Sequence, residues 1–321
     1  MRTDKHAISE PEEMTRAFRS IYGREPQGNE LTLLTQLSKL GLADSSDVFR
    51  AILGSLDHQT LKTAFSVRFS DRDVSYLPVQ GFLLAADRTD IAVGLPLANG
   101  NYESHVLRFY VERVKPGMTF VDVGANIGLY SLLAAKLVGE GGHVLSFEPN
   151  SENCRLMLLS LNKNGYINVA VFPIALSDKT GHAFFTTHIG SNGGLLPDTV
   201  AVLSDPSCIV IPTTRMDDFV HERVDFIKID VEGAEALVVM GAKNLIERHR
   251  PVITSEFSME MLPRVSGISC RDYLGYFRDN RYDIFMIDRS SKNLVSIPDI
   301  DLFLDSYGSI TRIEDLAFIP A

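Results

Sequence analysis

The sequence predicts an α/β protein, a mostly parallel sheet with helices on both faces, preceded by a small all-helical domain. Within residues 1–75, helical apolar spacing runs from Pro11 to about Phe69, and short apolar runs replace it after Val74. From residue 76 to residue 321, strand-like and helix-like segments alternate, which is the pattern of a parallel sheet. Unusual polar residues stand where the strands end, which is the edge at which such sheets bind ligands.

Composition limits the class of protein. The 321 residues are 45% hydrophobic and 22% charged, as expected of a soluble globular chain, and the net charge is −10. This acidity argues against a nucleic-acid partner, which needs a basic face. Three cysteines without paired spacing indicate reduced thiols and a cytoplasmic setting. No cleavable signal and no apolar run of about 18 residues is present, so no membrane span is expected.

The first domain is predicted to be helical from Pro11 to about Phe69. Apolar residues at helical spacing share one face, and Gly41 ends one of the helices. The segment around Gly23 and Arg24 resembles a small helical module of bacterial glycan-associated and surface proteins. The alternative is a helical cap that packs on the second domain or joins two copies into a homo-oligomer.

Two short elements should precede the main sheet. The runs G-F-L-L-A-A and I-A-V-G-L flank the polar turn D-R-T-D and predict a β-hairpin that leads into the sheet. A helix should begin at Ser104 and close at Pro116 and Gly117, because apolar residues recur on one face between them.

The stretch from Thr119 to Tyr130, T-F-V-D-V-G-A-N-I-G-L-Y, organises the second domain. A β-prone apolar run ends at Gly124, and an apolar helical pattern starts at Leu129. This strand, glycine turn and helix N-terminus would let a ligand approach bare backbone. The stretch therefore predicts the first turn of a nucleotide-binding fold.

The spacing of the glycines in this turn indicates which ligand it could bind. A dinucleotide fingerprint needs three glycines, but Asn126 and Leu129 occupy the second and third positions counted from Gly124. Asp122 would repel a diphosphate and would suit a ligand with an ammonium and a sulfonium group, which is S-adenosylmethionine. The alternative is an ordinary strand, turn and helix with a hydrogen-bonded Asp122.

The next strands carry further candidates. H-V-L-S-F-E-P-N ends in Glu148, where an acid can accept hydrogen bonds from both ribose hydroxyls or instead cap the following helix. Ala175, Leu176 and Ser177 leave the third strand, where an adenine base would rest. Residues 178–212 are mostly polar, contain G-S-N-G-G and form a candidate flexible lid.

The fourth strand, V-D-F-I-K-I-D-V-E-G-A-E, brings the densest group of charges. Lys228, Asp230 and Glu232 alternate along its exit, and Glu256 ends the fifth strand. Such carboxylates could act as a general base, anchor a substrate hydroxyl or bind a divalent metal through Asp230 and Glu232. The alternative is a structural network between Lys228 and the acids. The histidines lack metal-ligand spacing, and His105 is expected at the surface or a helix end.

Together these motifs resemble the FkbM family of S-adenosylmethionine-dependent methyltransferases. F-V-D-V-G-A-N-I-G, F-E-P-N, A-L-S-D, D-F-I-K-I-D-V-E-G-A-E and R-P-V-I-T-S-E occur in the family's order, within about Gly81 to Asp288. The resemblance implies a class I, Rossmann-like methyltransferase fold. It also implies two sets of site residues, a donor pocket at Tyr102, Glu103, Asp122, Gly124, Asn126 and Glu148, and active-site acids at Asp230, Glu232 and Glu256. Ala125, Gly128, Ala175, Leu176 and Ser177 are added as cofactor-binding candidates and Lys228 as a catalytic one.

The expected function is an O-methyltransferase acting on a hydroxyl of a sugar, glycan or polyketide-type natural product, as the resemblance implies. Its partner would be a small-molecule or glycan acceptor. A nicotinamide-dependent oxidoreductase on a related fold and a non-catalytic binding module remain as alternatives. The acceptor itself is not encoded in any motif.

Overall fold

The computed structural model describes residues 74–100, 102–189, 191–196, 208–307 and 312–321, and all of them fall within one compact unit, Phe69–Ala321. The predicted helical domain of residues 1–75 lies outside the described residues except at its last two positions. None of the described helices is long and apolar enough to cross a membrane. Cys154, Cys208 and Cys270 are all free thiols.

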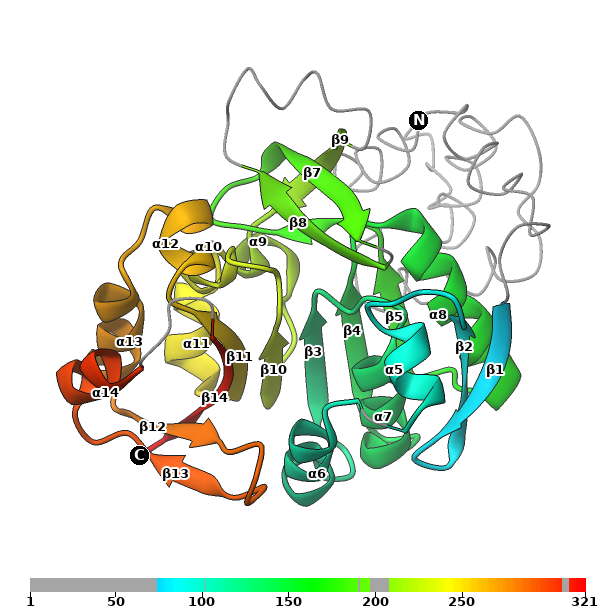
Figure 1. Cartoon of the computed structure of the whole chain (residues 1–321), viewed down its shortest axis with the longest axis horizontal. Coiled ribbons are helices and arrows are strands. Elements are labelled where there is room, and N and C mark those ends of the chain that lie inside the picture. The colour runs from blue at the N-terminus through cyan, green and yellow to red at the C-terminus, as the bar shows by residue number, and fades with distance from the viewer. Residues whose placement is uncertain (1–73, 101, 190, 197–207, 308–311) are drawn as a thin grey trace, which may run out of the picture. The chain divides into compact units, whose positions relative to one another are not determined.

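An eight-stranded sheet forms the centre of the molecule (Figure 1). Its order is β13-β12-β14-β11-β10-β3-β4-β5. The neighbours from β5 to β11 are parallel, whereas β14 enters antiparallel between β11 and β12. The strands are β3 (Thr119–Val123), β4 (His143–Phe147), β5 (Val169–Phe172), β10 (Phe226–Ile229), β11 (Val252–Ser258), β12 (Tyr282–Ile287), β13 (Leu294–Ser296) and β14 (Ile313–Pro320). This mostly parallel sheet confirms the predicted fold class.

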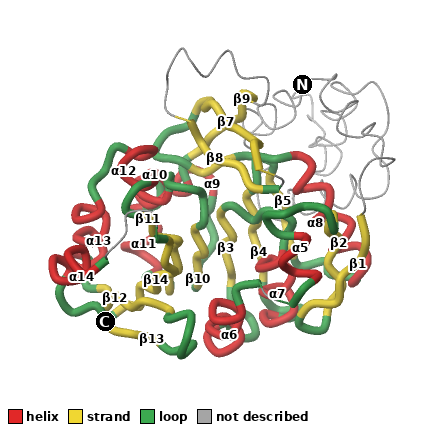
Figure 2. Tube along the Cα trace, viewed as in Figure 1, coloured by secondary structure: helices red, strands yellow, loops and turns green. Residues whose placement is uncertain are grey.

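Helices connect these strands and cover the sheet (Figure 2). The helix α6 begins at the predicted Ser104. The helices that flank the main sheet are α6 (Ser104–Arg113), α7 (Leu129–Val138), α8 (Ser151–Asn164), α9 (Met216–Phe219), α10 (Glu235–Met240), α11 (Lys243–His249), α12 (Met261–Ser266), α13 (Cys270–Asp279) and α14 (Ile300–Ser306).

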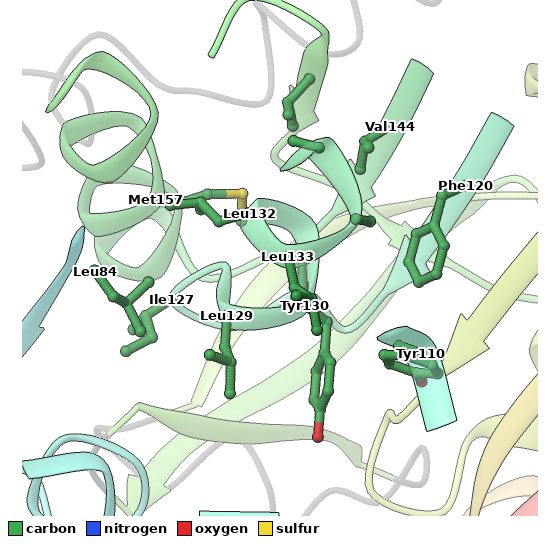
Figure 3. Packing of buried hydrophobic residues seen from close by; sticks show 14 of the residues in the cluster. Leu84, Tyr110, Phe120, Ile127, Leu129, Tyr130, Leu132, Leu133, Val144 and Met157 are labelled. Carbon is green, nitrogen blue, oxygen red and sulfur yellow. The ribbon is translucent and has the colours of Figure 1, made fainter. Parts of the chain in front are cut away.

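Successive side chains of a strand point to opposite faces of the sheet, and each face packs against its own set of helices. On one face, Phe120 of β3 stacks on Phe226 of β10, and Tyr110 of α6 packs edge-on against Phe120. Figure 3 shows Tyr110 and Phe120 in this core, together with Leu133 of α7. On the other face, Phe257 of β11 contacts Tyr273 of α13 and Tyr307, which follows α14. Helices therefore cover both faces, as predicted.

The predicted hairpin is partly wrong. Its strands are β1 (Val74–Val79) and β2 (Phe82–Asp87), and they form a separate two-stranded sheet. Gln80 and Gly81 both have positive φ, the backbone of a two-residue hairpin turn, so the chain reverses there and not at D-R-T-D. I-A-V-G-L forms no strand and instead leads into the short helix α5 (Gly94–Ala98).

The predicted third strand and lid also differ from expectation. The chain leaves the main sheet after β5, and β6 (Ala175–Leu176) joins a second sheet of order β6-β9-β7-β8. The other strands of this sheet are β7 (Gly181–Ile189), β8 (Asn192–Leu196) and β9 (Cys208–Thr214). The stretch of residues 178–212 thus contains paired strands. They are held by a small core in which Phe185, Ile211 and Ala175 pack together.

Candidate active site

A cavity of about 930 Å³, open to solvent, lies at the carboxyl ends of the parallel strands. The chain runs from β3 outward to β5 and then returns to β10 on the other side of β3, so the strand order reverses here. Ligands of open α/β sheets bind at such a reversal. The predicted residues that line the cavity are Tyr102, Glu103, Gly124, Ala125, Asn126, Glu148, Ala175, Leu176, Lys228, Asp230, Glu232 and Glu256. Asp122, Gly128 and Ser177 do not line it.

The glycine turn after β3 forms one wall of the cavity. Gly124 has φ +72°, and a Cβ at this position would lie 1.8 Å from the backbone oxygen of Asp230. No side chain therefore fits between the two strand ends. The amides of Gly124 and Ala125 both donate to the carbonyl oxygen of Phe147, which ties the turn to β4. Gly128 is the N-cap residue of α7 and packs against Met157 instead of facing the cavity.

Glu148 lies at the end of β4 and faces the same cavity. Its carboxylate accepts hydrogen bonds from the amides of Asn126 at 2.8 Å and Asn150 at 2.7 Å. Burial raises the pKa of Glu148 to about 7, although these two amide bonds act in the opposite direction. The carboxylate of Glu148 thus lines the cavity and also accepts a hydrogen bond from the N-cap residue of α8, while its binding of a ribose stays a prediction.

Lys228 links the glycine turn to the acids. Its Nζ donates to the carbonyl oxygen of Gly124 at 2.7 Å and lies 3.4 Å from Asp122 and 3.3 Å from Asp230. Burial alone would lower the pKa of Lys228, but Asp230 and Asp122 hold it above its ordinary value. Asp122 is fully buried and also accepts a bond from Ser131. Asp122 does not line the cavity, and Lys228 compensates its charge.

The remaining strand-end acids gather beside Lys228. Burial, and after it the neighbouring Asp230, raise the pKa of Glu232 to about 7. Glu103, the N-cap residue of α6, also has a pKa of about 7, chiefly because of burial. Burial and the neighbouring Asp230 place the pKa of Glu256 well above its usual range. Such perturbed carboxyls in a cavity are typical of functional sites.

Strand β8 closes the cavity from above and was not predicted to contribute residues. Asn192 accepts a hydrogen bond from the side chain of Asn126 at 3.1 Å and donates one to Glu232 at 3.1 Å. The carbonyl oxygen of Ser191 accepts from the side chain of Asn153 in α8 at 2.8 Å. These bonds fasten the β7–β8 hairpin to the glycine turn and to the exit of β10.

Three further residues escaped the sequence reasoning. Tyr130 of α7 is buried, lines the cavity and donates its hydroxyl to Glu103, and Figure 3 shows that hydroxyl directed away from Leu132 and Met157. A polar aromatic residue in the apolar first turn of α7 was the one available signal. Asp315 of β14 lies 2.8 Å from Nε2 of His105. His105 lies at a helix end, as the second residue of α6, but it is buried and not at the surface, and neither residue belongs to a motif.

The metal hypothesis finds no support in the described part of the chain. No three His, Cys, Asp or Glu side chains there gather closely enough to hold a metal ion. Asp230 is instead compensated by Lys228, and Glu232 is hydrogen-bonded to Asn192.

Sequence comparison gives two similarities. The sequence model described as the methyltransferase FkbM domain matches residues 122–310, which is more than half of the chain. The chain is also 25% identical over 167 residues to the 2-O-methyltransferase NoeI of Sinorhizobium fredii, a match covering 46% of this chain and 66% of NoeI. The chain thus spans slightly less than two thirds of that relative.

Structural comparison finds methyltransferases at low identity. A methyltransferase FkbM from Methylobacillus flagellatus is 18% identical with a TM-score of 0.41, and the match covers 94% of this chain and 58% of that one. A putative rRNA methylase from Clostridium thermocellum is 12% identical with a TM-score of 0.43, covering 67% of this chain and 94% of that one.

Proposed function

Because the chain belongs to the FkbM methyltransferase family, we propose that it catalyses S-adenosylmethionine-dependent O-methylation of a hydroxyl on a sugar, glycan or polyketide-type natural product. One observation carries the proposal. The glycine turn and Glu148 share a single cavity with Asp230, Glu232 and Glu256. A donor site therefore lies next to groups that can bind and deprotonate a hydroxyl.

The residues of one wall fit the methyl donor. Gly124 has no side chain, so a ligand can approach the backbone there. Glu148 presents a buried carboxylate, which is suited to accepting hydrogen bonds from ribose hydroxyls. Ala175 and Leu176 add apolar surface suited to an adenine ring. When bound, S-adenosylmethionine supplies a methyl group that is already activated by the sulfonium charge.

The protein has two tasks in this proposal, to orient the acceptor and to take one proton. Orientation can contribute up to about 7–11 kcal/mol, and a positioned base typically about 100-fold to 10,000-fold in rate. Asp230 and Glu232 are the base candidates. Nζ of Lys228 lies 3.3 Å from the carboxylate of Asp230, so this base candidate has a cationic partner beside the cavity.

The name of NoeI supports hydroxyl oxygen as the acceptor atom, because that relative is a 2-O-methyltransferase. The family match also favours methyl transfer over the nicotinamide alternative. Titration calorimetry with S-adenosylmethionine and with nicotinamide cofactors separates the two, since only the first should bind.

Replacing Asp230 by Ala tests the catalytic assignment. We expect turnover to fall by about 100-fold or more, because the hydroxyl loses its proton acceptor, while the donor still binds. The acceptor is first identified by a mass-shift screen of sugars, glycolipids and polyketides with the wild-type protein. Asp283→Ala is the matched control, since Asp283 is exposed on β12 and outside the cavity. Unchanged turnover in Asp230→Ala would remove this residue from the mechanism.

A further inference from the structure

Strand register brings three carboxyl groups into one row across the sheet. Glu256 of β11 and Asp315 of β14 are direct antiparallel partners. Ile229 pairs with Ser255 in the parallel ladder, so Asp230 falls beside Glu256 on its other side. All three line a smaller cavity of about 260 Å³ that shares Glu103, Tyr130 and Lys228 with the main one. Like charges placed directly opposite each other across strands destabilise a sheet.

The two outer carboxyls of this row have partners of their own. Asp230 lies 3.3 Å from Nζ of Lys228, and Asp315 lies 2.8 Å from His105 and 3.8 Å from Arg289. The carboxyl of Glu256, in contrast, makes no hydrogen bond or ion pair with any residue that the structure describes. A charge on Glu256 would therefore be uncompensated and would face a carboxylate on either side.

We infer that Glu256 is uncharged in the working enzyme and donates a hydrogen bond to an oxygen of the acceptor, while Asp230 and Glu232 remain the proton acceptors. The role of Glu256 as a hydrogen-bond donor rests on the proposed function, whereas its uncharged state does not. This role narrows the acceptor to molecules that have, close to the methylated hydroxyl, an oxygen that carries no proton, such as a ring ether, glycosidic or carbonyl oxygen. A carboxylate would repel the lone pairs of that oxygen.

Burial and the carboxyl groups on the neighbouring elements favour the uncharged form of Glu256. Burial is the largest cause that raises the pKa of Glu256, followed by the charges of Asp230, Glu232, Glu235 and Asp315. The titratable and charged groups around it are Lys228, Asp230 and Glu232 at β10, Glu235 of α10, Tyr102, Glu103, His105 and Tyr110 at α6, Tyr130 of α7, Tyr307 after α14, and Asp315 of β14 with its partner Arg289. Lys228 is already shared by Asp122 and Asp230. His105 and Arg289 approach Asp315.

Thermal unfolding of wild type and Glu256→Gln across pH tests the uncharged state and needs neither donor nor acceptor. A carboxyl whose folded pKa exceeds its unfolded pKa of about 4.3 destabilises the fold progressively as pH rises from that value through the folded pKa. Glutamine has no such penalty and keeps a hydrogen-bond donor. We therefore expect the melting temperature of Glu256→Gln to exceed that of wild type by about 4 °C or more at pH 8, and the difference to vanish toward pH 4.

Two further measurements keep the test decisive. Glu140→Gln is the control, because Glu140 is exposed and its replacement should leave the pH profile of the melting temperature unchanged. The infrared difference between wild type and Glu256→Gln at neutral pH should contain the carbonyl band of a protonated carboxyl group. A melting difference that is constant with pH, or an ionised carboxylate band, would overturn the inference whether or not the protein transfers methyl groups.

The donor role is tested by turnover once an acceptor is known. Glu256→Gln should retain activity within about 10-fold of wild type, since the amide still donates, whereas Glu256→Ala should lose about 100-fold. Wild type should also lose activity at alkaline pH as Glu256 ionises, and Glu256→Gln should not. Equal losses in Gln and Ala variants would mean that Glu256 acts as a carboxylate, against the inference.

Discussion

At the scale of single residues, the site depends on close approach as much as on charge. Gly124 touches the backbone oxygen of Asp230 where β3 and β10 end, so the donor turn and the first acid are in contact. Lys228 then binds the carbonyl oxygen of Gly124 and the carboxylate of Asp230. Lys228 and the lack of a side chain at Gly124 therefore hold the glycine turn against the exit of β10.

Gly124→Ala should abolish donor binding and destabilise the fold, because its Cβ would lie 1.8 Å from the oxygen of Asp230. Gly117→Ala is a matched control, since Gly117 also has positive φ (+83°) but no atom lies within 4 Å of an added Cβ. The control should lose about 1–2 kcal/mol from backbone strain, and Gly124→Ala about 1–3 kcal/mol more. Urea unfolding measures both losses, and equal values would contradict the steric argument.

At the scale of elements, the β7–β8 hairpin is the cover of the cavity. The side chain of Asn192 in this hairpin is hydrogen-bonded both to Asn126 of the glycine turn and to Glu232 after β10, so it contacts both sides of the cavity. Asp90, before α5, adds a contact to the amide of Ser191 at 3.3 Å. The hairpin is thus attached to the rest of the site by side-chain hydrogen bonds, and such an attachment can open more easily than a strand of the main sheet.

Asn192→Ala should speed dissociation of S-adenosylmethionine by about 10-fold, because the cover loses two hydrogen bonds that together are worth roughly 1–3 kcal/mol. A stopped-flow chase of bound donor measures the rate. Asn293→Ala provides the control, since Asn293 is exposed beyond β12 and far from the cavity residues in sequence. An unchanged rate would show that the hairpin does not limit donor exit.

At the scale of the whole molecule, the last strand completes the sheet. β14 lies between β11 and β12 and buries Leu316, Ala317 and Phe318 completely. It also carries Asp315, so the far end of the described chain contributes to the row of acids. The sheet and this part of the site therefore share the same strand.

A chain ending at residue 310, where the family match stops, should be insoluble or unfolded, because β11 and β12 would lose their common partner. Removal of Ala321 alone is the control, as this residue is exposed and outside β14. Circular dichroism and gel filtration of both chains check the result. A soluble, folded chain ending at residue 310 would show that β14 is dispensable for the sheet.

Local patterns were sufficient for the elements that carry chemistry. The start of α6 at Ser104, the turn at Gly124 and the end of β4 just before Glu148 all follow from short-range spacing. The predicted end of the fifth strand at Glu256 was wrong, because β11 continues to Ser258. The position of the hairpin turn was predicted wrongly because Gln80 adopts a positive φ, which is uncommon for glutamine and is not indicated by the sequence. The strands within residues 178–212 escaped notice because their few apolar residues gain burial only against one another.

The sequence by itself determined the fold class, the glycine turn and the acids at the strand ends, because these depend on periodicity and backbone sterics over a few residues. Only the tertiary structure decided which charges are compensated. Lys228 pairs with Asp122 below the cavity, His105 pairs with Asp315, and Glu256 is left between two carboxylates. These relations join segments separated by 100 residues or more, or depend on the insertion of β14. Strand order and register create them, and no local pattern records either.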